Sequence, residues 1–192
     1  MKNISLKTLV TALGMSFLLG ASAPALEIEG VQIPQQTTVS GQTLQLNGAG
    51  LRSFKVLLVR IKVYVASFYS AVPLRTAADA MATQGPVKFN FTFLVAVDQG
   101  KVADAWNSQF KASATATYPG LPKDQAAFVS MFGPLKAGGV QSVEIEGNAT
   151  RMYDGGKLKG TITGRDFQKA FLSMWFGPNP VTSDLKAALL GS

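Results

Sequence analysis

The chain has 192 residues, a formal net charge of +7, and neither histidine nor cysteine. This composition excludes a Ser-His-Asp triad, a thiolate nucleophile and the usual zinc sites, and no metal or other cofactor is expected. The positive charge favours an anionic partner. However, the lysines and arginines are scattered rather than gathered in the basic runs that are typical of nucleic-acid binding, so no nucleic-acid partner is expected.

The first 25 residues have the pattern of a secretory signal peptide. Lys2 and Lys7 precede an apolar run at residues 9–19, and Ala-Pro-Ala at residues 23–25 places small side chains before a cleavage site. The apolar run is too short to span a bilayer comfortably. We therefore expect residues 1–25 to be removed. The single remaining domain, residues 26–192, would be periplasmic or secreted and would have no membrane span.

Two short strands are predicted at the start of this domain, at residues 26–33 and 43–46, with Pro34 and Gly41 between them. Residues 48–50 read Gly-Ala-Gly, and this fragment lacks the third glycine of a dinucleotide-binding loop. It is instead predicted to form a tight turn into the next strand.

A long strand is predicted over residues 55–69, which contain no glycine or proline and many β-branched and aromatic residues. Successive side chains of a strand point to opposite faces. One face would carry Arg60, Lys62 and Tyr64. The other would carry hydrophobic side chains, namely Leu57, Val59, Ile61, Val63 and Val65. Because the first face combines positive charge with a phenol, it is expected to lie against either solvent or a site for an anion.

A short helix is predicted at residues 76–82, followed by a half-buried strand at residues 87–97 in which hydrophobic and polar side chains alternate. One face of this strand is expected to lie under the covering helices and the other to be wetter. The covered face would carry Phe89, Phe91, Phe93 and Val95, and the wetter face Lys88, Asn90 and Thr92.

Two helices are predicted next, one beginning at Asp98 and one at Lys123. The first presents Val102, Ala105, Trp106 and Gln109 on one face. Three strands at residues 140–146, 149–153 and 157–163 follow, separated by glycine-containing turns. Two helices at residues 166–176 and 183–190 end the chain. This order predicts an α+β fold in which an antiparallel β-sheet is covered on one face by helices.

Three segments resemble the chalcone isomerase family, and specifically its bacterial chalcone-isomerase-like branch. They are GAGLR at residues 48–52 with the Lys-Val-Tyr strand that follows, ITGRDF leading into FLSMWFGP at residues 162–178, and LKAALLG at residues 185–191. The resemblance spans nearly all of the chain after residue 26. It implies the same architecture, an open-faced sandwich with a ligand cleft between the sheet and the helices.

The resemblance also implies roles for particular residues. Arg52 matches the cleft arginine that meets the anionic oxygen of the substrate in chalcone isomerases. Tyr64 falls at a threonine of the plant enzyme, and the non-catalytic fatty-acid-binding relatives pair an arginine with a tyrosine to hold a carboxylate. Asn107 is a loose match to the enzyme's asparagine. Together with Lys62 of the basic strand face, these are the candidate ligand-binding residues.

Two departures from the enzyme's pattern argue against ring closure. Its later tyrosine would fall at residues 98–102, where this chain has none, and its late hydroxyl would fall at Lys169 or Ala170. The sequence therefore favours non-catalytic binding of a fatty acid or similar small amphipathic acid, since a guanidinium and a neutral phenol suit a carboxylate. An isomerase, or intramolecular lyase, acting on a chalcone-like unsaturated carbonyl compound is the alternative. A third possibility is an interaction protein whose cleft has closed.

Overall fold

The computed structural model describes residues 25–113 and 118–192. The expected signal peptide lies outside these residues except for Ala25. The described part contains nine strands and five helices. The strands are β1 (Leu26–Ile28), β2 (Val31–Ile33), β3 (Gln36–Val39), β4 (Gln42–Val56), β5 (Val59–Ser70), β6 (Val87–Phe93), β7 (Val140–Glu146), β8 (Ala149–Asp154) and β9 (Lys157–Thr163). The helices are α1 (Ala77–Ala82), α2 (Gln99–Ser113), α3 (Leu121–Ser130), α4 (Arg165–Phe176) and α5 (Ser183–Leu189).

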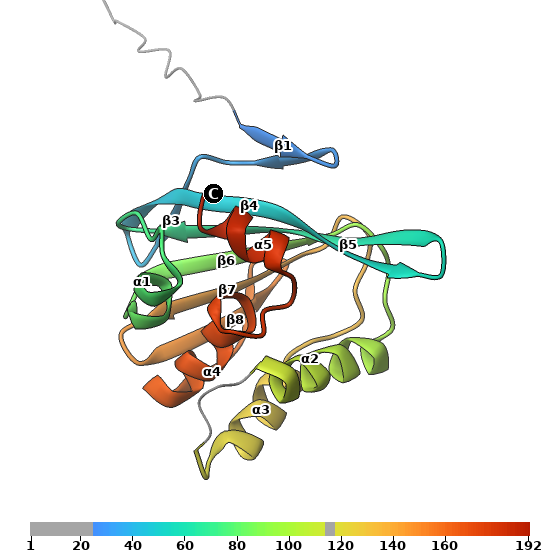
Figure 1. Cartoon of the computed structure of the whole chain (residues 1–192). Coiled ribbons are helices and arrows are strands. Elements are labelled where there is room, and N and C mark those ends of the chain that lie inside the picture. The colour runs from blue at the N-terminus through green and yellow to red at the C-terminus, as the bar shows by residue number, and fades with distance from the viewer. Residues whose placement is uncertain (1–24, 114–117) are drawn as a thin grey trace, which may run out of the picture.

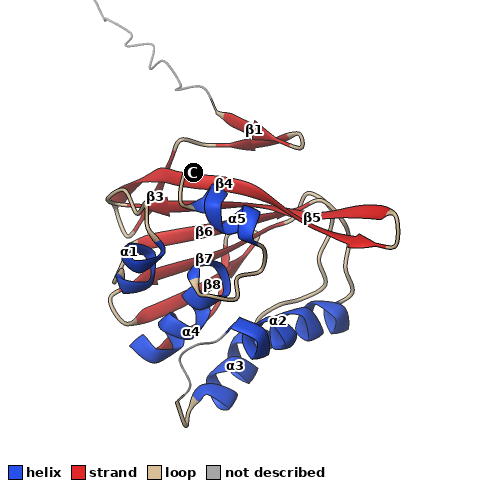
Figure 2. Cartoon of the chain, viewed as in Figure 1, coloured by secondary structure: helices blue, strands red, loops and turns tan. Residues whose placement is uncertain are grey.

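Strands β3 to β9 form one antiparallel sheet in which every strand pairs with its neighbour in sequence. The sheet is curled, and all five helices lie on one side of it (Figure 1). Figure 2 shows the same division between strands and covering helices. This arrangement confirms the predicted α+β fold. None of the described helices has the length and hydrophobicity needed to cross a membrane.

Strand β6 alternates as its sequence predicts. Phe89, Phe91 and Phe93 are at most 7% exposed, whereas the polar residues between them are partly exposed. Val95 lies beyond the end of the strand and is half-buried. Helices α2, α3 and α4, with Phe132 two residues beyond α3, complete this core with a set of aromatic rings: Trp106, Phe110, Phe128, Phe132, Phe167, Phe171, Trp175 and Phe176. The helix-covered face is therefore an aromatic core.

The opposite face of the sheet is partly covered by the hairpin of β1 and β2, which is a separate two-stranded sheet. Its side chains pack on a second cluster that includes Val65 and Tyr69 of β5. The single strand predicted at residues 26–33 is wrong, because Glu29 and Gly30 adopt left-handed conformations (φ 53° and 76°) that reverse the chain. Strand β3 was not predicted.

Strand β4 is much longer than the predicted strand at residues 43–46, and residues 48–50 are part of it rather than a turn. Helix α5 packs directly on this stretch. A Cβ on Gly48 would lie 2.1 Å from the carbonyl oxygen of Ala188, and one on Gly50 would lie 2.7 Å from the Cβ of Ala188. The two glycines are needed because they let a helix approach the strand backbone closely.

The strand predicted at residues 55–69 is also corrected. The chain reverses at Leu57 and Leu58, so residues 55–56 end β4 and β5 begins at Val59. Leu57 has φ 54°, a conformation that leucine rarely adopts, so none of the usual turn residues marks this reversal. Both faces of β5 are buried towards its end. Tyr64 and Phe68 face the helices, whereas Val65 faces the β1–β2 hairpin.

Candidate ligand-binding cleft

Arg52 and Tyr64 are brought together by the pairing of β4 with β5. The two residues lie directly opposite each other, and the next pair is Ser53 with Lys62, so Val63 is an extra residue on β5. A bulge of this kind bends the strand and redirects its side chains. Residues opposite each other in an antiparallel pair share a face. The predicted convergence of the arginine and the phenol is therefore present, on the helix-covered side.

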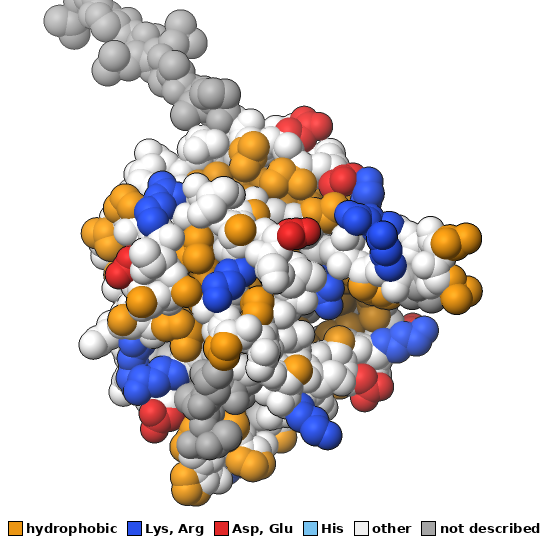
Figure 3. Space-filling model, in the orientation of Figure 1, with side chains coloured by type: hydrophobic (Ala, Val, Ile, Leu, Met, Phe, Trp, Pro, Cys, Tyr) orange, Lys and Arg blue, Asp and Glu red, His pale blue; other side chains and the backbone are white. Residues whose placement is uncertain are grey.

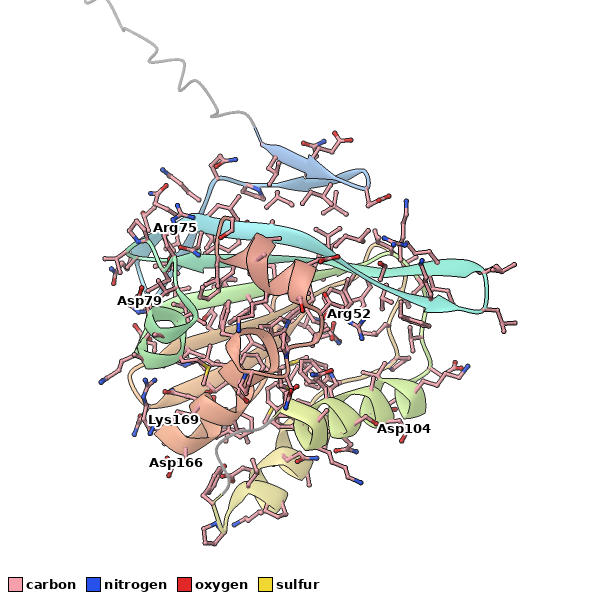
Figure 4. All side chains as sticks on the ribbon, in the orientation of Figure 1. Arg52, Arg75, Asp79, Asp104, Asp166 and Lys169 are labelled. Carbon is pink, nitrogen blue, oxygen red and sulfur yellow. The ribbon has the colours of Figure 1, made fainter. Side chains whose placement is uncertain are left out.

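A cleft of about 170 Å³ opens beside this pair, between the sheet and α2. In the space-filling view a hollow with hydrophobic walls lies below the hairpin of β4 and β5 (Figure 3). Arg52 lies in the space between the sheet and α2 (Figure 4). The lining is mostly apolar, and its main hydrophobic members are Phe54, Val63, Phe91, Phe93, Val97, Val102, Ala105, Trp106, Leu135, Trp175 and Val181. The predicted face of α2 contributes Val102, Ala105, Trp106 and Gln109.

The charges of the cleft are all of one sign. Arg52 and Lys101 line it, and no aspartate or glutamate does. The guanidinium of Arg52 donates a hydrogen bond from Nη1 to the carbonyl oxygen of Ser53 at 3.1 Å, and it lies close to the Tyr64 hydroxyl. Within residues 25–113 and 118–192, Arg52 forms no ion pair with a carboxylate. The cleft thus offers a half-buried positive charge whose donors are not used up by the protein.

The phenol of Tyr64 is a neutral donor beside this charge. Burial raises the pKa of Tyr64, and the nearby Arg52 guanidinium and the Trp175 indole, both close to the phenol oxygen, lower it only in part. The ring is held by edge-on contacts with Phe91 and Phe93, whose centroids lie 5.4 and 5.7 Å away. Tyr64 therefore presents a protonated hydroxyl in a fixed position.

Trp175 of α4 is a third donor, and no motif of the sequence predicts this role for it. It is 2% exposed and lines the cleft. In the described part of the chain its Nε1 forms no hydrogen bond of good geometry, although it lies close to the Tyr64 hydroxyl. Buried donors are normally paired, because an unpaired one loses its hydrogen bonds to water. Its place in the FLSMWFGP segment was visible in the sequence, but its unpaired state depends on the packing.

The other two candidate residues lie outside the cleft. Lys62 is exposed and forms an ion pair with Glu29, 2.6 Å from Nζ to Oε2. Asn107 is exposed on α2, where its Oδ1 accepts a 2.8 Å hydrogen bond from Nε2 of Gln125. Neither side chain lines the cleft around Arg52.

The late helix offers no hydroxyl to the cleft. Lys169 of α4 points outward beside Asp166, 3.9 Å from Nζ to Oδ1 (Figure 4), and Ala170 is fully buried. The hydroxyl of Ser173 donates to the carbonyl oxygen of Ala170 at 2.7 Å. The described residues also contain no group of three or more acidic side chains that could hold a metal ion.

Chemically, this arrangement suits one anionic oxygen group attached to an apolar body. A guanidinium, a phenol and an indole N–H can all donate to a carboxylate, and the remaining walls can contact only hydrocarbon. The fold and the cleft together define an α+β protein with a cationic, otherwise apolar ligand site.

Comparison with known proteins assigns the chain to a family. A sequence profile of the family described as chalcone isomerase-like matches residues 25–191. The chain belongs to this family, as its motifs indicated. Among solved structures it is similar to the crystal structure of a fatty-acid binding protein from Arabidopsis thaliana, with 13% sequence identity and a TM-score of 0.59. That similarity covers 84% of this chain and 92% of the other and concerns the fold. No curated protein sequence matches the chain significantly.

Proposed function

We propose that this protein is an exported, non-catalytic carrier that binds a fatty acid or similar small amphipathic acid in the cleft between the sheet and α2. Arg52, Tyr64 and Trp175 hold the carboxylate, and the hydrophobic walls contact the alkyl or aryl part. The observation that carries the proposal is the half-buried Arg52, which meets no carboxylate within the described residues and faces neutral donors in an apolar cleft.

Physical chemistry supports a carboxylate over other ligands. A charged guanidinium in apolar surroundings favours an anion, and charge-assisted hydrogen bonds are stronger than neutral ones. A dianion would lose more hydration on entering the apolar cleft, and Lys101, the second cation of the lining, is exposed, so Arg52 alone would have to offset that loss. The name of the similar Arabidopsis protein, which states that it binds fatty acid, agrees with this choice.

The size of the cleft limits the ligand. Its volume of about 170 Å³ is close to that of the ~150 Å³ protein cavity that accepts benzene. The inner space therefore holds a ring or a short stretch of alkyl chain, and a longer chain extends through the mouth beside Phe54. Affinity should rise by about 0.8 kcal/mol for each methylene that becomes buried and level off once the inner space is filled.

Titration calorimetry with a series of linear carboxylic acids and their methyl esters tests this proposal. We expect the acids to bind, the esters to bind at least about tenfold more weakly, and the chain-length dependence to level off as described. Equal affinity for acids and esters would contradict the carboxylate site. An activity assay tests the alternative. If the protein converts a 2′-hydroxychalcone to the ring-closed product, and this activity is lost when Arg52 is replaced, the protein is an isomerase and not a carrier.

Export rests on the first 25 residues, which lie almost wholly outside the described part. We propose that a signal peptidase removes residues 1–25, so that the periplasmic or secreted protein begins at Leu26. N-terminal sequencing and intact-mass measurement of the protein from the extracytoplasmic fraction check this. Full-length chain in that fraction, or a cytoplasmic location, would contradict it.

A further inference from the structure

The hairpin that ends β4 and begins β5 extends beyond the rest of the sheet. Strand β6 pairs with β5 only from Tyr64 to Ser70, so residues 53–62 pair only within the hairpin. Figure 1 shows this hairpin projecting to the right of the other strands. The segment from Phe54 to Ile61 is called the projecting hairpin below.

Its tip is hydrophobic and exposed. Leu57 and Leu58 are 94% and 101% exposed, and Val59 and Phe54 are 63% and 43% exposed. These four make up half of the eight large hydrophobic side chains exposed in the described part of the chain. Tight hairpin turns normally contain glycine, asparagine or aspartate, yet this one places Leu57 at φ 54°. The turn geometry does not explain the two leucines, so they call for another reason.

A pair of positive charges lies directly behind this tip. Lys55 and Arg60 are exposed and occupy opposite positions on the two strands, an arrangement that is unfavourable between like charges. Neither forms an ion pair within the residues described here. Figure 3 shows the hydrophobic tip at the right edge of the molecule, with lysine and arginine side chains near it. An anionic surface against the hairpin would remove this repulsion.

We propose that the projecting hairpin docks on an anionic phospholipid bilayer. Leu57, Leu58 and Val59 enter the boundary between head groups and acyl chains, and Lys55 and Arg60 contact lipid phosphates. Apolar side chains backed by lysine and arginine are typical of interfacial membrane binding, and each positive charge strengthens attachment to anionic lipid. The small, convex tip is too narrow to bury the ~800 Å² per partner that a stable protein interface needs, which argues against a second copy.

Docking would place the cleft at the membrane surface. Phe54 belongs to the projecting hairpin and also lines the cleft. The mouth of the cleft therefore opens beside the docked hairpin. If the ligand is the amphipathic acid of the proposed function, on which this step rests, it could pass between bilayer and cleft without crossing water. Docking itself does not depend on the ligand.

Vesicle flotation tests docking directly. The protein used starts at Leu26, because residues 26–192 hold every described strand and helix and both buried clusters. The vesicles are phosphatidylcholine alone, or phosphatidylcholine with about one-third phosphatidylglycerol. We expect binding to the anionic vesicles that weakens at high salt, and at least about tenfold weaker binding to phosphatidylcholine alone.

Three variants sharpen the test. Leu57→Gly with Leu58→Ser keeps a favourable turn and should weaken binding to anionic vesicles at least about tenfold. Lys55→Gln with Arg60→Gln should weaken it roughly 10- to 30-fold and remove the salt dependence. The matched control is Leu158→Ser, which removes a 55% exposed leucine from the β8–β9 hairpin and should change nothing.

Two results of the flotation experiment would overturn docking. One is that the parent protein does not float with anionic vesicles, and the other is that the double leucine variant floats as well as the parent. Loss of a dimer in the double leucine variant, measured by analytical ultracentrifugation, would instead assign the tip to self-association. Calorimetry with a soluble acid separates the two proposals, because the leucine variant should keep acid binding whereas Arg52→Gln should lose it and still float.

Discussion

Two tyrosines of β5, Tyr64 and Tyr69, show how one strand serves two purposes. Tyr69 is buried and Tyr64 is half-buried, and burial raises the pKa of both phenols. Tyr69 faces the β1–β2 hairpin, and its hydroxyl donates to the carbonyl oxygen of Pro34 at 3.0 Å. Tyr64 faces the helices, next to the unpaired charge of Arg52. The first phenol has its partner inside the fold, whereas the second lies next to a guanidinium that forms no ion pair within the described residues.

The surroundings of the two phenols distinguish a structural polar group from a binding one in this fold. A second pocket of about 140 Å³ lies beside Tyr69, but it is lined by neutral side chains such as Ser67, Asn90 and Thr92. The cleft beside Tyr64 contains Arg52 and Lys101 and no acid. The candidate site is distinguished by a positive charge without an ion pair and by donors available to a ligand, and not by the presence of a cavity alone.

The largest expected effect is on stability and concerns β6, which pairs with β5, the strand of the two tyrosines. Phe91 pairs with Ala66 of β5 and is 2% exposed. Phe91→Ala should lower the free energy of unfolding by about 3–5 kcal/mol, as for other buried aromatic residues. Urea denaturation measures this. A loss below about 1 kcal/mol would mean that the helix-covered face is not the core.

Replacing each tyrosine by phenylalanine sharpens the comparison. Tyr64→Phe should weaken acid binding by about 2- to 12-fold, the share of one neutral hydrogen bond, with little effect on stability. Tyr69→Phe should lower the free energy of unfolding by about 0.5–1.5 kcal/mol and leave binding unchanged. Calorimetry and urea denaturation on both variants give the four numbers. The comparison fails if the two variants behave alike.

The indole of Trp175 tests whether unpaired donors mark the site. Trp175→Phe removes Nε1 and keeps an aromatic ring, so it should weaken acid binding by about 2- to 12-fold. The control is Trp106→Phe. Trp106 also lines the cleft, but it is the indole of Trp175 that lies close to the Tyr64 hydroxyl. Equal losses for the two variants would show that the effect comes from packing rather than from the donor.

The smallest expected effect is the response to alkaline pH. Because burial raises the pKa of Tyr64 above its ordinary value of about 10, the phenol remains a donor at neutral and mildly alkaline pH. Affinity for an acid should be flat between about pH 7 and 9. The stabilisation linked to the raised pKa is present below the ordinary value and is lost as the pH rises through the folded-state value. A fall in affinity centred below pH 9 would contradict this protonation state.

How far the sequence predicts this molecule varies along the chain. Strand β6 was predictable because its strict alternation reflects one buried and one wetter face. The reversal at Leu57 and Leu58 was not, because two leucines carry none of the usual turn signals. Gly48 and Gly50 were misread as a turn because their cause, the close approach of α5, is a contact with residues more than 130 positions away.

The site shows the same limits. Arg52 and Tyr64 could be proposed from the family motif, and strand pairing places them side by side. Strict alternation places Lys62 on the same strand face as Tyr64, but the bulge at Val63 separates it from the cleft. Asn107 rests on a loose match to the family's asparagine and lies outside the cleft. The donor role of Trp175 depends on burial and on the absence of a partner among the described residues, which no sequence pattern records.

The central claim is that Arg52 holds the carboxylate of an apolar acid. Calorimetry on the parent, on Arg52→Ala and on the control Lys62→Ala tests this claim. Lys62→Ala removes a positive charge of the same strand pair, β4 and β5, that lies outside the cleft. We expect Arg52→Ala to weaken binding of a linear acid by roughly 10- to 150-fold. The methyl ester should bind the parent and Arg52→Ala equally, and Lys62→Ala should bind the acid like the parent. If Arg52→Ala binds the acid as tightly as the parent does, the carboxylate site does not exist and Arg52 is a structural residue.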